Sequence, residues 1–146
     1  MPDSLDQLVT TFYRAFSGEV DLVDDVVTSD WKDIPAHPGQ APGPDGIKPV
    51  IKGIGGSFSD FEIVVHDVID GRGPDGNGKI GVRGEIRGVH TGDTFGIAAT
   101  GRHIRIALHE FHEVVNGRLA TTWHLEDWFG FFKAVGQAPR ISEENK

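Results

Sequence analysis

The stretch RHIRIALHEFHEVVNGRLATTWHLED, residues 102–127, holds two segments that alternate apolar and polar residues on either side of Asn116-Gly117. Asparagine and glycine tolerate positive φ at both central positions of a tight turn, so this dipeptide predicts a β-hairpin. The two strands of the hairpin are expected over residues 102–115 and 118–127. A two-residue turn also fixes which residues lie opposite one another.

In this register Glu110 is expected opposite Trp123, and Ile106 opposite Asp127. Because side chains alternate along a strand, one face of the hairpin then combines apolar walls with carboxylates and an imidazole. Its members are Ile106, Leu108, Glu110, His112, Thr121, Trp123, Leu125 and Asp127. The opposite face holds His109, Phe111, Glu113, Thr122, His124 and Glu126. A carboxylate among apolar neighbours is expected to have a raised pKa, and a nearby histidine can share its proton. Such groups suit proton transfer at a carbon beside a carbonyl.

Two other interpretations of these residues stay open. Glu110 and His112 could form an exposed salt bridge, which contributes about 0–1 kcal/mol. His109 opposite His124 suggests a metal pair, with zinc as the candidate. No third ligand is evident, however, and carboxylates nearby can solvate the imidazoles. We therefore expect no metal and no cofactor.

Composition narrows the function classes. The chain has 146 residues, of which 38% are hydrophobic and 25% charged. This length and composition are typical of one globular domain that buries a hydrophobic core. The absence of cysteine excludes disulfides and thiolate chemistry. A formal charge of -8 without a Lys/Arg cluster argues against a nucleic-acid partner. No apolar run approaches the ~20 residues that cross a membrane, and the polar start does not resemble a signal peptide. We expect a soluble, cytoplasmic protein.

The chain ahead of the hairpin shows helical spacing first and strands later. Apolar residues predict helices over residues 5–16 and 19–27, and a third that begins at Pro44. Residues 31–45 read as irregular. Strands are expected over residues 61–69 and 79–89, and a short helix over residues 128–135. Helices followed by long antiparallel strands predict an α+β fold. We expect one domain over residues 1–137 and a polar tail over residues 138–146.

Four stretches carry a family resemblance. They are Gly88-Val89-His90-Thr91-Gly92 with Thr100-Gly101-Arg102, then Asn116-Gly117-Arg118-Leu119, then Trp123, Asp127, Gly130 and Gly136 at their spacing, and His37-Pro38 ahead of Pro42-Gly43-Pro44-Asp45-Gly46. Together they resemble the SnoaL-like polyketide cyclases (ester cyclases) of the nuclear transport factor 2-like superfamily. The resemblance implies a cone in which three N-terminal helices pack on a curved, mostly antiparallel sheet that encloses an apolar pocket.

The same resemblance implies a reaction. Family members of known chemistry close a ring of aromatic polyketides by intramolecular aldol condensation, without metal or organic cofactor. The family's acid/base aspartate corresponds to Asp127, and His112 or His90 is the expected donor to the enolate. The predicted register points both His112 and Asp127 inward. An apolar, polycyclic small molecule is the expected substrate. Its expected binding residues are His90, Trp123, Glu110, His37, Tyr13, Phe16, Trp31 and Leu125.

Three alternatives accompany this hypothesis. The same cone can host isomerase, dehydratase or epoxide hydrolase chemistry, because a fold does not fix a reaction. A non-catalytic binder of an apolar metabolite is a second class. A homodimer or higher homo-oligomer is also expected from the resemblance, with His109, Phe111, Thr122 and His124 at its interface.

Overall fold

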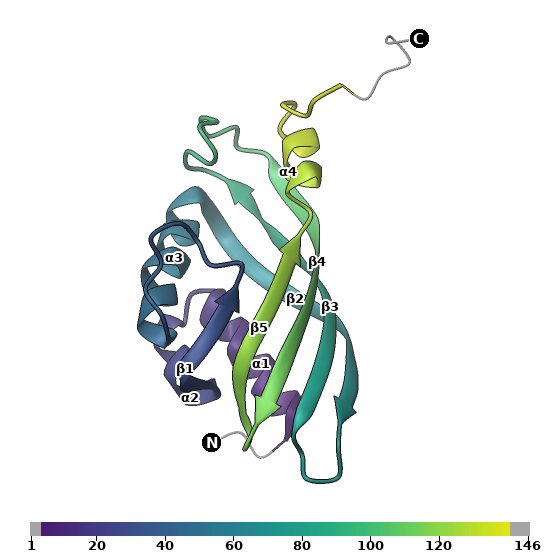
Figure 1. Cartoon of the computed structure of the whole chain (residues 1–146). Coiled ribbons are helices and arrows are strands. Elements are labelled where there is room, and N and C mark those ends of the chain that lie inside the picture. The colour runs from purple at the N-terminus through teal and green to yellow at the C-terminus, as the bar shows by residue number, and fades with distance from the viewer. Residues whose placement is uncertain (1–3, 141–146) are drawn as a thin grey trace.

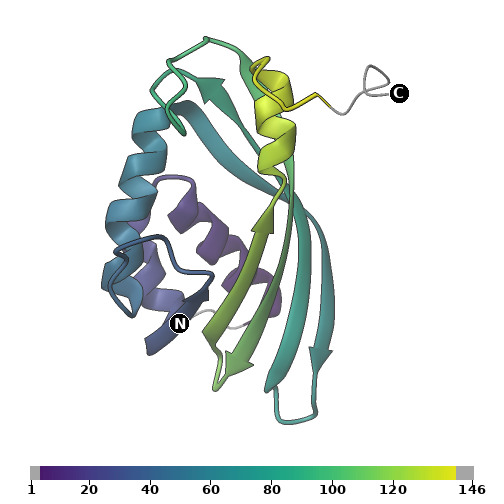
Figure 2. The ribbon, with the colours of Figure 1, turned by 45° about the horizontal axis from the view of Figure 1, so that its top comes forward.

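The computed structural model describes residues 4–140, which form one curved sheet with helices on its concave side (Figures 1 and 2). The strand order is β1-β5-β4-β3-β2, with β1 parallel to β5 and the other pairs antiparallel. In chain order the elements are α1 (Leu5–Phe16), the 3-10 turn η1 (Val20–Leu22), α2 (Val23–Val26), β1 (Val27–Ile34), α3 (Pro44–Ser57), β2 (Phe58–Arg72), β3 (Gly78–His90), β4 (His103–Val115), β5 (Arg118–Glu126) and α4 (Trp128–Ala134). The predicted α+β class is confirmed.

Helix α1 forms because its first turn is capped and its apolar side chains share one face. The hydroxyl of Ser4 accepts a hydrogen bond from the Gln7 backbone at 3.1 Å, which satisfies a donor that the helix itself cannot. The buried face comprises Leu8, Val9, Phe12, Tyr13 and Ala15. This face packs under the sheet, so the Tyr13 phenol enters the interior 3% exposed.

An irregular segment was expected over residues 31–45, but strand β1 continues to Ile34. The prediction is therefore wrong for residues 31–34. Residues 27–34 do not alternate apolar and polar residues cleanly, and their burial is correspondingly uneven. What makes them a strand is parallel pairing with β5, in which Ile34 lies opposite Trp123. The pairing buries Trp31 to 1% exposure, as part of the core.

The hairpin turn is confirmed, but the register beyond it is not. Asn116 and Gly117 both have positive φ, 50° and 79°, as a tight turn of this kind requires. The register then shifts between Val114 and Glu113, because Ala120 is an extra residue on β5. Such a β-bulge moves every later side chain of its strand to the other face.

The bulge therefore corrects the predicted faces of β5. His112 lies opposite Thr122, and Glu110 lies opposite His124. Thr122, His124 and Glu126 consequently belong to the concave face together with Glu110 and His112. Trp123 and Leu125 belong to the outer face, where Leu125 is 72% exposed.

The core fills the space between the concave face and the helices, and comprises side chains from every layer. Its largest fully buried members are Trp31, Phe12, Phe131, Ile80, Leu108 and Leu119. Among residues 4–140, no helix combines the length and the hydropathy that crossing a bilayer would need.

Candidate functional site

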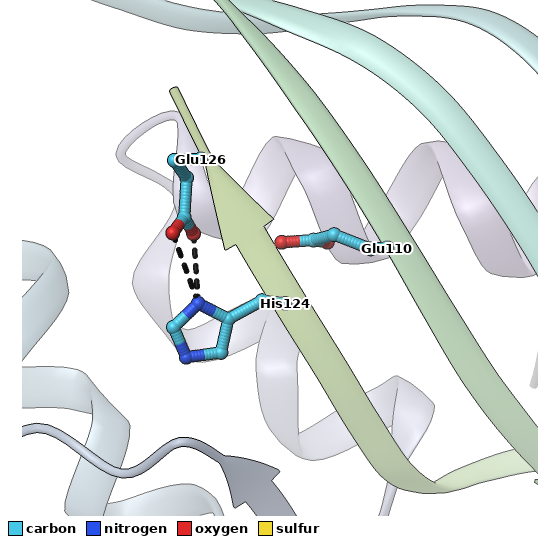
Figure 3. Close-up of side chains that lie close together, drawn as sticks. All are labelled: Glu110, His124 and Glu126. Atoms are coloured by element: carbon cyan, nitrogen blue, oxygen red, sulfur yellow. Dashed lines mark hydrogen bonds and ion pairs between the residues drawn. The ribbon is translucent and has the colours of Figure 1, made fainter. Parts of the chain in front are cut away.

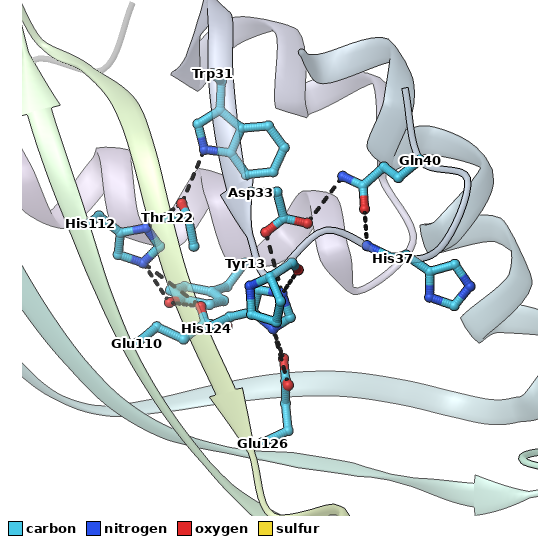
Figure 4. Close-up of polar contacts among 11 residues, drawn as sticks. Tyr13, Trp31, Asp33, His37, Gln40, Glu110, His112, Thr122, His124 and Glu126 are labelled. Carbon is cyan, nitrogen blue, oxygen red and sulfur yellow. Dashed lines mark hydrogen bonds and ion pairs between the residues drawn. The ribbon is translucent and has the colours of Figure 1, made fainter. Parts of the chain in front are cut away.

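Three buried polar side chains from α1 and β4 meet inside the cone (Figure 4). The Tyr13 hydroxyl donates to Oε1 of Glu110 at 2.6 Å and lies 2.8 Å from Nε2 of His112. Glu110 is 7% exposed and His112 is completely buried. These two residues point inward because they alternate with outward neighbours along β4. The structure thus brings together three of the residues that the sequence singled out.

The network continues from His112 to β5 and β1. Nδ1 of His112 lies 2.7 Å from the Thr122 hydroxyl, which also accepts a hydrogen bond from the Trp31 indole at 3.0 Å. An indole N–H can only donate, so the Thr122 oxygen is the acceptor in that bond. The hydroxyl hydrogen of Thr122 is therefore free to donate a hydrogen bond to Nδ1 of His112. His112 then donates from Nε2 to the phenol oxygen, and the phenol proton is directed at Glu110. In this ordering every hydrogen bond has one donor and one acceptor.

Burial shifts the pKa values of this network in opposite directions. It raises the pKa of Glu110 to about 8, although the hydrogen bond from Tyr13 acts the other way. It lowers the pKa of His112 to about 3. Burial, followed by the neighbouring Glu110, raises the pKa of the Tyr13 phenol well above its usual value. The prediction that a carboxylate on this face has a raised pKa is confirmed for Glu110. Near pH 7 its neutral form predominates, and its ionised form is a stronger base than an ordinary carboxylate.

A second group lies beside Glu110 at the ends of β1 and β5 (Figure 3). Nδ1 of His124 lies 2.8 and 3.1 Å from the two oxygens of Glu126. Its Nε2 lies 2.6 Å from the backbone oxygen of Pro35 and 3.6 Å from Oδ1 of Asp33. Asp33 also accepts from the Gln40 amide at 3.1 Å. His124 is therefore surrounded by acceptors.

These acceptors stabilise a protonated His124. Burial by itself lowers its pKa, but Glu126, the Pro35 carbonyl and Asp33 outweigh burial and raise the pKa to about 9. Burial raises the pKa of Asp33, against the nearby charge of His124. Near pH 7 the site thus holds an imidazolium paired with Glu126, beside a neutral Glu110. Titratable groups whose environments shift their pKa values are the usual candidates for acid and base roles, and Glu110 and His124 are two such groups.

Within the part of the chain described by the structure, Glu110, His124 and Glu126 form the only group of three or more side chains that could together hold a metal ion. Glu110, His124 and Glu126 each offer one ligand atom, and these atoms lie within 4.8 Å of one another. Two carboxylates and one imidazole suit a divalent cation. To bind one, His124 would have to release a proton from Nδ1, where it is held by Glu126. The alternative of a His109–His124 metal pair is excluded, because His109 faces outward and His124 inward.

Asp127 does not occupy the predicted place. It follows β5 and is the N-cap of α4, where Oδ1 accepts from the Gly130 backbone at 3.0 Å. Its side chain is exposed rather than directed into an apolar interior. Two other predicted site residues, Trp123 and Leu125, also lie outside the interior because of the bulge at Ala120.

The remaining predicted residues are distributed along the cone. Trp31 joins the network through Thr122. Phe16 is half-buried and packs on Phe12, with ring centroids 4.8 Å apart. His37 is exposed, and its backbone N–H donates to the Gln40 side chain at 2.8 Å. His90 is fully buried at the far end of β3, apart from the network.

Sequence reasoning missed four polar residues of the site: Thr122, His124, Glu126 and Asp33. The first three were assigned to the outer face by a register without a bulge. Asp33 lies in β1, which was not expected to be a strand. The signal available for the first three was the i, i+2, i+4 spacing of polar residues, which matches that of Glu110 and His112 on the partner strand.

Comparison with known proteins agrees with this architecture. The sequence model of the SnoaL-like polyketide cyclase family matches residues 7–135. No curated protein matches the chain. Solved structures do match, and three of them illustrate the range.

TsrD from Streptomyces laurentii superposes with a TM-score of 0.79 at 22% identity, over 91% of this chain and 95% of its own. IdmH from Streptomyces antibioticus, assigned as a polyketide cyclase, has a TM-score of 0.73 at 22% identity, over 90% and 97%. AclR from Streptomyces galilaeus, assigned as a hydroxylase, has a TM-score of 0.73 at 15% identity, over 96% and 85%. At such identities these likenesses establish the fold alone.

Proposed function

Because this chain belongs to the SnoaL-like polyketide cyclase family, we propose that it is a cofactor-independent enzyme in which Glu110 transfers a proton at a carbon beside a carbonyl. The observation that carries the proposal is the environment of Glu110. Its carboxyl is buried, held by Tyr13, and close to the His124–Glu126 pair. A buried carboxyl with a pKa near the working pH is suited to both accept and return a proton.

The proposed reaction is an intramolecular aldol condensation on an apolar, polycyclic substrate. Ionised Glu110 takes the proton as the C–H bond breaks, and the electron pair forms an enolate. The enolate carbon attacks a second carbonyl of the same molecule, and the resulting alkoxide receives a proton from neutral Glu110. In this proposal the positive charge of His124, which lies beside Glu110, stabilises the negative charge that develops on the oxygen atoms. No net proton or electron is gained.

Each neighbour of Glu110 has a role in this account. Tyr13 donates to the ionised carboxylate and fixes its orientation. His112, which burial keeps neutral, in turn fixes the phenol.

Exchange of an acidic carbon-bound proton tests the proposal without knowledge of the natural substrate. The probe is 2-tetralone, a bicyclic ketone, in D₂O, with loss of its proton signal beside the carbonyl followed by NMR. The wild-type chain is expected to accelerate exchange, and Glu110→Gln to lower that acceleration by about 10²–10⁴-fold. Asp127→Asn is the matched control and is expected to retain the rate. Equal rates for wild type and Glu110→Gln would contradict the assignment, and binding without exchange would indicate a binding protein.

A further inference from the structure

His90 is held rigidly at the end of β3. Its backbone N–H donates to the Arg102 carbonyl at 2.9 Å, and its own carbonyl accepts from Gly101 at 2.8 Å. The side chain is completely buried, between the rings of Phe58 and Phe131 at centroid distances of 5.8 and 5.2 Å. Neither the site described above nor its mechanism uses this imidazole.

The hydrogen bonds of the ring determine its tautomer. The Thr100 backbone N–H points at Nδ1 over 3.3 Å, and the Thr100 hydroxyl lies 3.0 Å from the same atom. A backbone N–H can only donate, so Nδ1 must be the acceptor. A neutral imidazole whose Nδ1 accepts carries its hydrogen on Nε2. His90 therefore presents an Nε2–H group.

That Nε2–H group has no partner. Among residues 4–140 only two buried side-chain polar atoms lack a hydrogen bond, Nε2 of His90 and the hydroxyl of Thr28. Leaving a buried donor unsatisfied costs about 1–3 kcal/mol. Apolar side chains would have filled this position without that cost, so an unpartnered donor in an aromatic environment indicates a missing acceptor.

We propose that His90 is a substrate-recognition residue, whose Nε2–H donates to a carbonyl or hydroxyl oxygen at the end of the substrate remote from Glu110. The inference rests on the proposed function, since it assumes that the interior receives an apolar molecule. The rings of Phe58 and Phe131 flank His90, and Phe131 lies on the seven-residue helix α4.

His90 and Glu110 lie at different places along the sheet. Val82 lies opposite Glu110, and His90 is eight residues further along β3. At about 3.3 Å per residue this is roughly 25 Å along the strand, an upper bound for a curved sheet. The oxygen that His90 binds is therefore a different part of the substrate from the carbon that Glu110 deprotonates.

A matched pair of tricyclic probes tests the donor. Fluorene and 9-fluorenone have the same shape, but only the second carries a carbonyl. Their affinities are measured by equilibrium dialysis. The wild-type chain is expected to bind 9-fluorenone about tenfold more tightly than fluorene, in line with one hydrogen bond to a buried donor. His90→Phe is expected to abolish this preference while fluorene still binds. His90→Gln, which keeps an N–H donor, is expected to retain part of it.

NMR of the wild-type chain labelled with ¹⁵N-histidine gives a second measurement that does not depend on a variant folding. The Nε2–H resonance of His90 is expected to shift with 9-fluorenone and not with fluorene.

The outcomes separate this inference from the proposed function. Equal affinity of the wild type for the two probes, or a preference that survives in His90→Phe, would overturn the role of His90 even if Glu110→Gln loses proton exchange. If neither probe binds, the polycyclic substrate class fails, and the inference fails with it.

Discussion

The phenol of Tyr13 donates to Oε1 of Glu110 across 2.6 Å, although the two residues are 97 positions apart in sequence. The contact joins the first helix to the fourth strand inside the core. It also favours the ionised form of a carboxyl whose burial favours the neutral form. The balance of these two effects sets the pH at which Glu110 can act as a base.

Removing that hydroxyl is expected to move the pH dependence of the reaction. In Tyr13→Phe the carboxylate loses its donor, so the pKa of Glu110 rises further. The exchange rate of 2-tetralone should therefore reach its plateau at a higher pH than in the wild type. The buried partners left unsatisfied should lower the free energy of unfolding by about 1–3 kcal/mol. The measurement is a pH–rate profile beside a urea titration. An unchanged or acid-shifted profile in a folded variant would refute the coupling.

Replacing Asp127 is expected to affect the stability of the fold and not the rate of the proposed reaction. Its carboxylate caps α4 through Gly130, and replacement of an N-cap residue by alanine costs about 1 kcal/mol. Asp127→Ala should therefore lower the melting temperature, whereas Asp127→Asn, which can still accept, should not. Both variants should keep the exchange rate measured below their melting temperatures. Loss of exchange in a stable Asp127→Asn variant would restore this residue as the base.

The sequence was sufficient to predict features with a local cause. The Asn116-Gly117 turn needs only positive φ at two positions, and the first helix needs only its apolar spacing and its cap. The inward direction of Glu110 and His112 also follows from alternation along β4, and it predicted a carboxyl with a raised pKa.

What failed was set by distant parts of the chain. Ala120 has no property that marks it as an extra residue, and the bulge brings Thr122 to the distant Trp31 and to His112. Strand β1 likewise depends on pairing with β5. Because the extra residue was not recognised, the predicted register exchanged the two faces of β5. It therefore assigned His124 and Glu126 to the face opposite that of Glu110 and His112.

The stability of the chain is expected to be greatest between about pH 4.5 and 6.5. Glu110 has a pKa raised from 4.5 to about 8, so its contribution is complete below pH 4.5 and is lost as the pH rises toward 8. His124, raised from 6.5 to about 9, likewise loses its contribution between those values. His112, lowered from 6.5 to about 3, acts in the opposite direction and destabilises the fold as the pH falls below 6.5. Above pH 6.5 the two losses add.

Melting temperatures measured from pH 4 to 9.5 test this profile, with Glu110→Gln as the matched variant. The neutral amide does not ionise, so its curve should rise between pH 4.5 and 6.5, where that of the wild type is flat, and should fall less steeply than that of the wild type between pH 6.5 and 8. Parallel curves for the two proteins would show that Glu110 does not titrate as described.

The outer face of the sheet is expected to form a homodimer. Ile69, Phe111 and Leu125 are 73%, 61% and 72% exposed, and Phe111 lies opposite Trp123 on the neighbouring strand. Exposed apolar patches of this kind mark interaction surfaces. Of the interface residues expected from the sequence, His109 and Phe111 do face outward, whereas the bulge turns Thr122 and His124 inward.

Light scattering after gel filtration measures the mass in solution. The wild type should elute as a dimer, and Phe111→Glu should dissociate it, because each copy would bury an unpaired carboxylate at the contact. His103→Glu adds the same charge to an exposed position of β4 outside the patch and should leave the dimer intact. A monomeric wild type, or dissociation by both variants alike, would remove this face as the interface.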